Sequence, residues 1–104
     1  MLRPSAHTDT FAQDNLPAED TWPDLLLDGF DYPDRLNAAV ELTDRMVDQG
    51  FGDHTALIGN GRRRTYKELA DWTNRLAHAL VEDLGVRPGN RVLIRSANNP
   101  AMVA

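Results

Sequence analysis

The stretch "TYKELADWTNRLAHALVEDLG" (residues 65–85) decides the fold class because it carries a complete set of helix signals. Thr65 and Glu68 stand at capping-box spacing, in which each side chain accepts a hydrogen bond from the other residue's backbone N–H. Gly85 suits a left-handed C-cap, and Pro88 prevents the helix from continuing. The residues predicted to share one buried helix face recur every three or four positions: Leu69, Ala70, Thr73, Leu76, Ala77, Leu80, Val81 and Leu84.

A β-hairpin is predicted directly before this helix. Residues 55–58 (TALI) and residues 62–65 (RRRT) are strand candidates on either side of a Gly-Asn-Gly sequence at residues 59–61. Asn-Gly tolerates positive φ angles and is the strongest short-range signal for a tight hairpin turn. The Gly-rich sequence is therefore interpreted as a turn, since it also lacks the GxGxxG spacing of a nucleotide-binding loop.

Three further elements are predicted farther from the central helix. Residues 34–49 (DRLNAAVELTDRMVDQ) have an apolar face at helical spacing and are followed by "GFG" at residues 50–52. Residues 91–95 (RVLIR) follow the turn sequence "RPGN" and are rich in apolar and β-branched residues, which predicts a strand. Asn99 and Pro100 are suited to the N-cap and first position of a final helix.

This order of elements predicts an α/β fold: irregular arm, helix, β-hairpin, helix, strand and start of a helix. Residues 1–33 form the arm, with four of the six prolines and no sustained period but many large apolar residues. Residues 34–104 form a partial α/β subdomain. A helix of one turn is mostly nucleation cost, so we expect the subdomain to be incomplete at its C-terminal end and the chain to be a fragment of a larger protein.

Composition excludes several classes of protein. The 104 residues contain 41% hydrophobic and 26% charged residues, as in ordinary globular domains. The net charge of −5 argues against nucleic acid as a partner, and no apolar run approaches the length that spans a membrane. The absence of cysteine excludes disulfides and thiolate chemistry in this segment. We expect a cytoplasmic protein whose partner is the remainder of its own parent chain.

The run Arg62-Arg63-Arg64 is the most conspicuous charged feature of the sequence. It could bind phosphate or nucleic acid, but alternate strand residues point to opposite faces. Three arginines after a tight turn are more typical of a solvated edge, where charge discourages pairing between sheet edges. The solvated edge is therefore the favoured interpretation.

The remaining candidates for chemistry are histidines and acidic residues. The histidines do not lie at metal-ligand spacing, and structural or exposed roles are favoured for all of them: His7, His54 and His78. The acids Asp28, Asp31 and Asp34 recur every third residue but lack the twelve-residue calcium-loop pattern. The residues therefore assign no catalytic, cofactor-binding or metal-ligating position within the chain.

Taken together, several stretches resemble the N-terminus of an adenylate-forming acyl-CoA synthetase. "TYKELADWTNRLAHAL" (residues 65–80) followed by "GVRPGNRVLIRSANNP" (residues 85–100) is similar to the superfamily. "DTFAQDNLP" (residues 9–17) and "YPDRLNAAVEL" (residues 32–42) resemble its benzoate and 2-aminobenzoate CoA ligases. The resemblance implies an N-terminal fragment of the large domain of such an enzyme.

The resemblance also implies the chemistry of the parent protein. These enzymes join a carboxylate to AMP with ATP and magnesium, and then transfer the acyl group to the thiol of coenzyme A. Their phosphate loop, adenine motif, magnesium-binding acid and C-terminal lysine have no counterpart in residues 1–104, so the fragment itself is expected to be inactive. The alternative is a non-enzymatic interaction module that functions alone and associates with copies of itself.

Overall fold

The computed structural model describes residues 6–104. The chain forms two compact units, which are described separately. The first holds the described residues up to Leu36 together with Arg87–Arg91, and the second holds Asn37–Val86 and Val92–Ala104. The elements are a set of helices and one two-stranded antiparallel sheet, which agrees with the predicted α/β class. Within the described residues, no helix has both the length and the apolar character needed to cross a membrane.

The second unit is organised around α4 (Tyr66–His78), which continues as a π-helical segment, η3 (Ala79–Asp83). The predicted capping box is confirmed: the Thr65 N–H donates to Glu68 Oε2 (2.8 Å) and the Glu68 N–H donates to Thr65 Oγ1 (3.2 Å). The predicted glycine cap is also confirmed. Gly85 has a φ of 66°, and beyond it the Val86 N–H donates to the Leu80 carbonyl at 2.9 Å.

The predicted hairpin is confirmed as β1 (Thr55–Gly59) and β2 (Arg62–Thr65), which pair antiparallel with Gly59 opposite Arg62. The turn residues Asn60 and Gly61 have φ angles of 51° and 71°. Positive φ at both central positions is the geometry that the Asn-Gly signal predicts. The register shifts between Thr55 and Leu57, at the end of the hairpin where the chain enters from the preceding loop.

The single helix predicted over residues 34–49 is wrong in its extent and continuity. Three short segments take its place: α2 (Ala38–Leu42), α3 (Asp44–Met46) and η2 (Val47–Phe51), in which the helical geometry is interrupted at Gly50 with a φ of 86°. The first begins after Asn37, whose Oδ1 accepts from the backbone N–H groups of the second and third helical residues at 3.1 and 3.3 Å. The break falls at Thr43, with φ −121° and ψ −70°. Its hydroxyl donates to the Ala39 carbonyl at 2.7 Å, and this local bond competes with regular helix geometry.

The strand predicted over residues 91–95 is also wrong, because this segment has no regular secondary structure. A strand is defined by its neighbour, and among residues 6–104 the only sheet is the hairpin. Without a partner strand, Leu93 remains 93% exposed. The helix start beyond it is confirmed as α5 (Pro100–Val103), where Asn99 Oδ1 accepts from the N–H groups of Ala101 and Met102.

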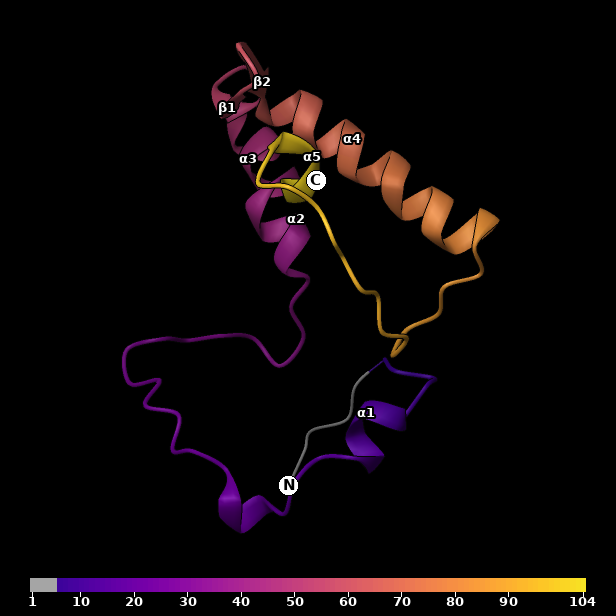
Figure 1. Ribbon diagram of the computed structural model, residues 1–104. Helices are drawn as coiled ribbons and strands as arrows, with labels where there is room; N and C mark the ends of the chain where they lie inside the picture. The colour runs from indigo at the N-terminus through magenta and orange to yellow at the C-terminus, as the bar shows by residue number, and fades with distance from the viewer. Residues whose placement is uncertain (1–5) are drawn as a thin grey trace. The chain divides into compact units, whose positions relative to one another are not determined.

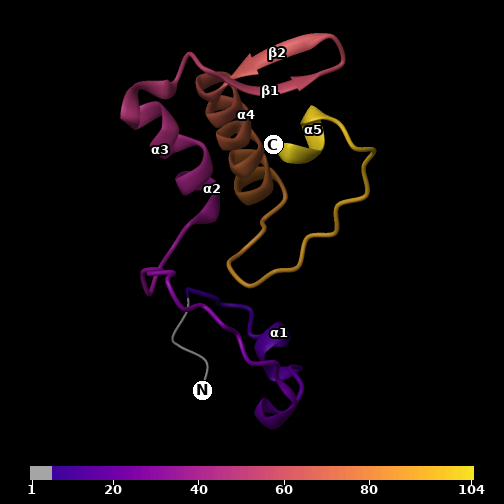
Figure 2. The ribbon, with the colours of Figure 1, turned by 90° about the vertical axis from the view of Figure 1, so that its left-hand side faces the viewer.

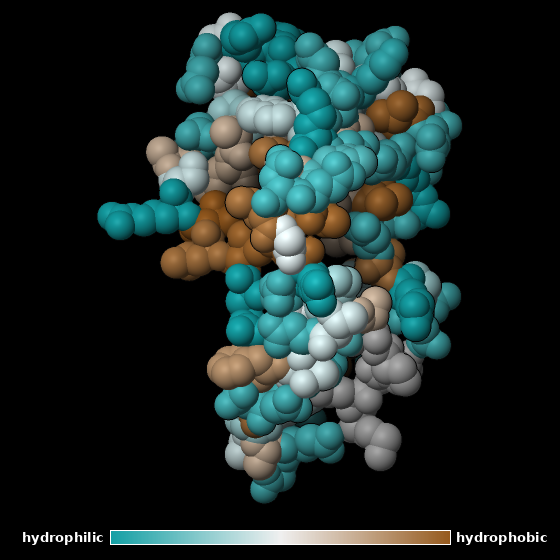
Figure 3. All heavy atoms as spheres, turned by 90° about the vertical axis from the view of Figure 1, so that its right-hand side faces the viewer, coloured by the Kyte–Doolittle hydropathy of each residue, from teal (hydrophilic) through white to brown (hydrophobic). Residues whose placement is uncertain are grey.

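The segments α3 and η2 lie beside α4, and the hairpin lies at its N-terminal end (Figures 1 and 2). Burial is concentrated where these elements meet, at Leu69 (6% exposed), Ala70 and Thr43. The predicted apolar face of α4 and η3 is fully buried only at Leu69 and Ala70, since Thr73 and Leu80 are half-buried, Leu76 is 40% exposed and Leu84 is 72% exposed. Figure 3 shows apolar side chains open on one face of the molecule.

The first unit contains α1 (Phe11–Asp14) and a single 3-10 turn, η1 (Glu19–Thr21), within otherwise irregular chain. Its best-connected residue is Asp9. The Asp9 carboxylate accepts from the Phe11 N–H (3.0 Å) and the Asn90 side chain (2.8 Å), and it pairs with Arg91 at 2.9 Å. The Arg91 guanidinium also lies 4.3 Å from the centre of the Phe11 ring. These contacts close the loop at residues 87–91 against a segment about 80 positions earlier in the chain.

Leu69→Ala should lower the free energy of unfolding by about 2–5 kcal/mol, because it removes the most buried large side chain and leaves a cavity. Leu76→Ala is the matched control on the same helix, and its partly exposed position predicts a clearly smaller loss. Urea denaturation followed by circular dichroism measures both variants. Equal losses would show that the exposed part of the helix face is buried in solution.

Gly59→Ala should lower the free energy of unfolding by about 1–3 kcal/mol through overpacking. A Cβ at this position would lie 2.6 Å from Pro100 Cγ at the start of α5, so one of the two segments must shift. Gly52→Ala is the control, since its Cβ would approach Val47 Cγ1 only to an ordinary 3.5 Å. Denaturation curves for the two variants test this contact, and coincident curves would contradict it.

The pKa of Asp9 should lie below its ordinary value of 3.8, chiefly because the Phe11 N–H donates to the carboxylate and also because Asn90 and Arg91 do so. A carboxyl whose pKa is lowered by folding contributes stability above its unfolded pKa. This stabilisation is lost as the pH falls below 3.8 and through the lower pKa that Asp9 has in the folded state. A carboxyl titration by NMR measures the midpoint.

Arg91→Gln should raise that midpoint toward 3.8, since it removes one of the groups that lower the pKa of Asp9. Arg87→Gln is the control, because no ion pair joins the Arg87 side chain to Asp9. A wild-type midpoint at or above 3.8 would contradict the contacts of the Asp9 carboxylate.

Candidate functional site

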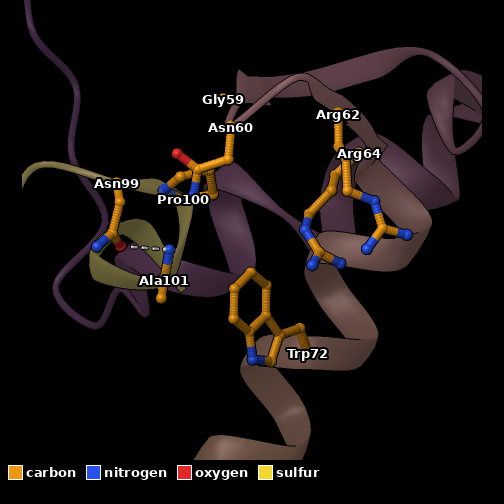
Figure 4. Close-up of a pocket in the computed structure, with 8 residues that line it drawn as sticks. All are labelled: Gly59, Asn60, Arg62, Arg64, Trp72, Asn99, Pro100 and Ala101. Carbon is orange, nitrogen blue, oxygen red and sulfur yellow. Dashed lines mark hydrogen bonds between the residues drawn. The ribbon is translucent and has the colours of Figure 1, made fainter.

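A hollow of about 270 Å³ lies where the hairpin turn, the first turns of α4 and the start of α5 come together. Figure 4 shows the residues around it. Its lining combines two guanidinium groups, two amide side chains and an indole ring, with no carboxylate among the residues that form it: Gly59, Asn60, Arg62, Arg64, Trp72, Asn99, Pro100 and Ala101.

One wall of the hollow is formed by two arginines of β2 and by the Trp72 ring of α4. Arg62 and Arg64 alternate along the strand and so share one face of it, whereas Arg63 belongs to the other face. The Arg64 guanidinium lies 4.4 Å from the centre of the Trp72 ring, which is a cation–π contact. Within residues 6–104, neither Arg62 nor Arg64 has an ion pair, so their charge is not neutralised by this part of the chain.

The opposite wall is set by close approach of two backbone segments. Gly59 has no side chain, and this lets Pro100 lie against the end of β1. Asn99 is engaged as the cap of α5, so its amide oxygen is used by that helix (Figure 4). A second hollow of about 340 Å³ shares Gly59, Asn60, Asn99 and Pro100 with the first, and Leu57, Ile58, Asn98 and Val103 complete its lining. Its lining is therefore mixed polar and apolar and contains no charged side chain.

The prediction of a solvated arginine edge holds for two of its three residues. Arg62 and Arg63 are exposed, but Arg64 is half-buried on the indole of Trp72. Trp72 was not singled out from the sequence, since it lies beside the apolar helix face rather than on it. The sequence feature that could have indicated Trp72 is its position, two turns into a helix that directly follows a strand rich in arginine.

The histidines have local roles or exposed positions. His78 Nδ1 lies 3.2 Å from Glu82 Oε1, one helical turn later, with both side chains exposed. His54 is exposed, and its ring centre lies 5.2 Å from that of Phe51. His7 is an exposed residue of the first unit.

The acids Asp28, Asp31 and Asp34 lie in irregular, exposed chain of the first unit. Across residues 6–104, no group of three or more histidine, cysteine, aspartate or glutamate side chains is arranged to hold a metal ion.

Comparison with known proteins identifies the family. The model of the AMP-binding enzyme family matches residues 44–104, which include the hairpin, α4, α5 and both hollows. A 3-hydroxybenzoate–CoA/4-hydroxybenzoate–CoA ligase from Thauera aromatica is 42% identical over 69 residues, which are 66% of this chain and 13% of that protein. A benzoate–CoA ligase from the same organism is 42% identical over 60% of the chain and 12% of its own length.

An acetyl-coenzyme A synthetase from Streptomyces avermitilis is also 42% identical, over 58% of this chain and 10% of that protein. No solved structure matches the chain. The match to these relatives spans about one-eighth of their length or less. The resemblance to adenylate-forming CoA ligases is confirmed, and because the family model covers more than half of its residues, the chain belongs to the AMP-binding enzyme family.

Proposed function

We propose that the chain is the N-terminal structural portion of an ATP-dependent, AMP-forming acid–CoA ligase. The observation that carries this proposal is the match of residues 44–104 to the AMP-binding enzyme family, together with relatives that are CoA ligases and CoA synthetases. In such a protein this segment has a structural role, and the catalytic residues lie in the rest of the parent enzyme. We place the parent in the cytoplasm, in keeping with a segment that has no cysteine.

The chemistry proposed for the parent follows from the reactivity of carboxylic acids. A carboxylate is a poor electrophile because its oxygen is a poor leaving group. Attack of the carboxylate on the α-phosphate of ATP releases pyrophosphate and forms an acyl-adenylate, from which AMP leaves readily. Attack by the thiol of coenzyme A then forms the thioester and releases AMP, and the thiol proton goes to solvent or a base.

The described residues do not fit the cofactors of this reaction. Magnesium takes carboxylate oxygens as protein ligands, but residues 6–104 bring together no acidic group that could hold it. The two hollows of about 270 and 340 Å³ lie at the lower end of the range typical of small-molecule and cofactor sites, roughly 300–1,000 Å³. ATP, magnesium and coenzyme A are therefore assigned to the remainder of the parent protein.

The scaffold role is supported by the distribution of apolar surface. Leu76, Val81 and Leu84 on the predicted apolar face of α4 and η3 are exposed to solvent, as are the apolar side chains of residues 92–94. Exposed apolar surface of this extent marks a face that another body covers. In the proposed parent, that body is the rest of the large domain.

The proposed substrate is an aromatic carboxylate of the benzoate or 2-aminobenzoate type. The hydroxybenzoate ligase matches 66% of this chain, whereas the acetyl-coenzyme A synthetase matches 58% at equal identity. The resemblance of the segments at residues 9–17 and 32–42 to aryl-CoA ligases points the same way.

A second candidate is a stand-alone module that associates with itself. The same open apolar faces favour it, because exposed patches recruit other chains. Sedimentation of the 104-residue chain at several concentrations separates the two candidates. If the 104-residue chain forms a dimer as its concentration rises while the parent protein stays monomeric, the stand-alone module is favoured.

The parent protein should release AMP from ATP only when both coenzyme A and an aromatic acid are present. Benzoate and 3-hydroxybenzoate are tested against acetate in a coupled AMP assay, and acetate should be the poorer substrate by at least about tenfold in kcat/KM. The 104-residue chain is the matched control and should show no turnover. Turnover with acetate but with neither aromatic acid would show that the proposed substrate is wrong. No turnover with any of the acids would contradict the proposal that the parent is a ligase.

A further inference from the structure

We propose that the hollow between the hairpin turn, α4 and α5 is an oxyanion-binding site, which takes a carboxylate or phosphate group between Arg62 and Arg64. The inference goes beyond the ligase reaction, because it concerns a surface that the proposed chemistry does not use. It rests on the charge, geometry and lining of the hollow within the second unit.

The first argument is the unneutralised charge. Elsewhere in the described chain, Arg45, Arg75 and Arg91 each pair with a carboxylate, whereas Arg35, Arg63, Arg87 and Arg95 have no ion pair and line neither hollow. Arg62 and Arg64 also have no ion pair but do line the hollow, and no carboxylate lines it, although the chain carries a net charge of −5. Two guanidinium groups on one strand face repel each other unless an anion lies between or beside them. An oxyanion is the group that relieves this repulsion.

The second argument is preorganisation. The cation–π contact with Trp72, at 4.4 Å from the ring centre, holds the Arg64 guanidinium at the hollow. The edge of a guanidinium group matches the two oxygens of a carboxylate or phosphate, which guanidinium groups bind in a bidentate manner. Arg62 lies on the same strand face and lines the same hollow, so it can contribute a second set of donors (Figure 4).

The third argument is the shape and size of the hollow. With a volume of about 270 Å³, it has room for an anionic end group and a few further atoms. Trp72 beside the guanidinium groups and Pro100 on the opposite wall are apolar, and Asn60 adds an amide to the lining. A carboxylate side chain of the parent protein and a free phosphate-bearing molecule share the required chemistry, and the experiment separates them.

Trp72 lies in the site and serves as the probe. In a Trp22→Phe background, it is the only tryptophan of the chain. Its fluorescence is titrated with inorganic phosphate and, separately, with acetate at constant ionic strength. We expect a saturable change with at least one of them; a response to phosphate alone points to a phosphate-bearing molecule, and a response to acetate points to a carboxylate.

Three matched variants locate the binding. Arg62→Gln and Arg64→Gln should each weaken it by about tenfold or more, the loss expected for a hydrogen bond to a charged group. Arg63→Gln removes the same charge from the opposite strand face and should leave the affinity unchanged. The circular dichroism of each variant is recorded beside the titration.

Several results would overturn the proposal. A titration without saturation for both anions would do so, and so would equal weakening by all three variants, which would indicate non-specific attraction. A wild-type chain without a helical circular dichroism signal would also overturn it, because the hollow requires the hairpin, α4 and α5 to be folded. Binding that survives Arg62→Gln and Arg64→Gln in folded variants would place the anion elsewhere.

Discussion

The second unit depends on how the backbone N–H groups at the start of α4 are satisfied. A helix leaves its first N–H groups without partners inside the helix. Here the Tyr66 N–H donates to the His54 carbonyl at 3.1 Å and the Lys67 N–H donates to the Gly52 carbonyl at 2.9 Å. The capping box satisfies the next N–H, since Thr65 accepts from Glu68. The helix start is therefore bonded to the loop before β1 as well as to β2.

This constraint positions the hollow. Because Thr65 is both the last residue of β2 and the cap of α4, the strand runs directly into the helix with no connecting loop. Arg64 then lies one residue before the helix and Trp72 lies two turns into it, so the guanidinium reaches the indole ring. Gly59, at the other end of the hairpin, admits Pro100 and closes the far wall.

The second unit has a small core because most of its large apolar side chains remain exposed. The large apolar side chains along α4 and η3 are mostly open beyond Leu69, and so are those of residues 92–94. A domain of this size is marginal even when it is well packed. The match to a related CoA ligase covers 66% of this chain but only 13% of that protein's length, which is in keeping with the proposal that further protein covers the open faces.

The sequence by itself determined the elements whose stabilising bonds are local. The Asn60-Gly61 turn, the cap at Thr65 and the start of α5 after Asn99 each depend on residues within three or four positions, so their patterns predicted them correctly. Only the tertiary structure decided the rest. Residues 91–95 form no strand because a strand requires a neighbour, and the Arg64–Trp72 contact exists only because the strand and helix are held together. The break in the helix predicted over residues 34–49 is different: it comes from a local bond, from the Thr43 hydroxyl to the Ala39 carbonyl four positions earlier, which the apolar periodicity does not reveal.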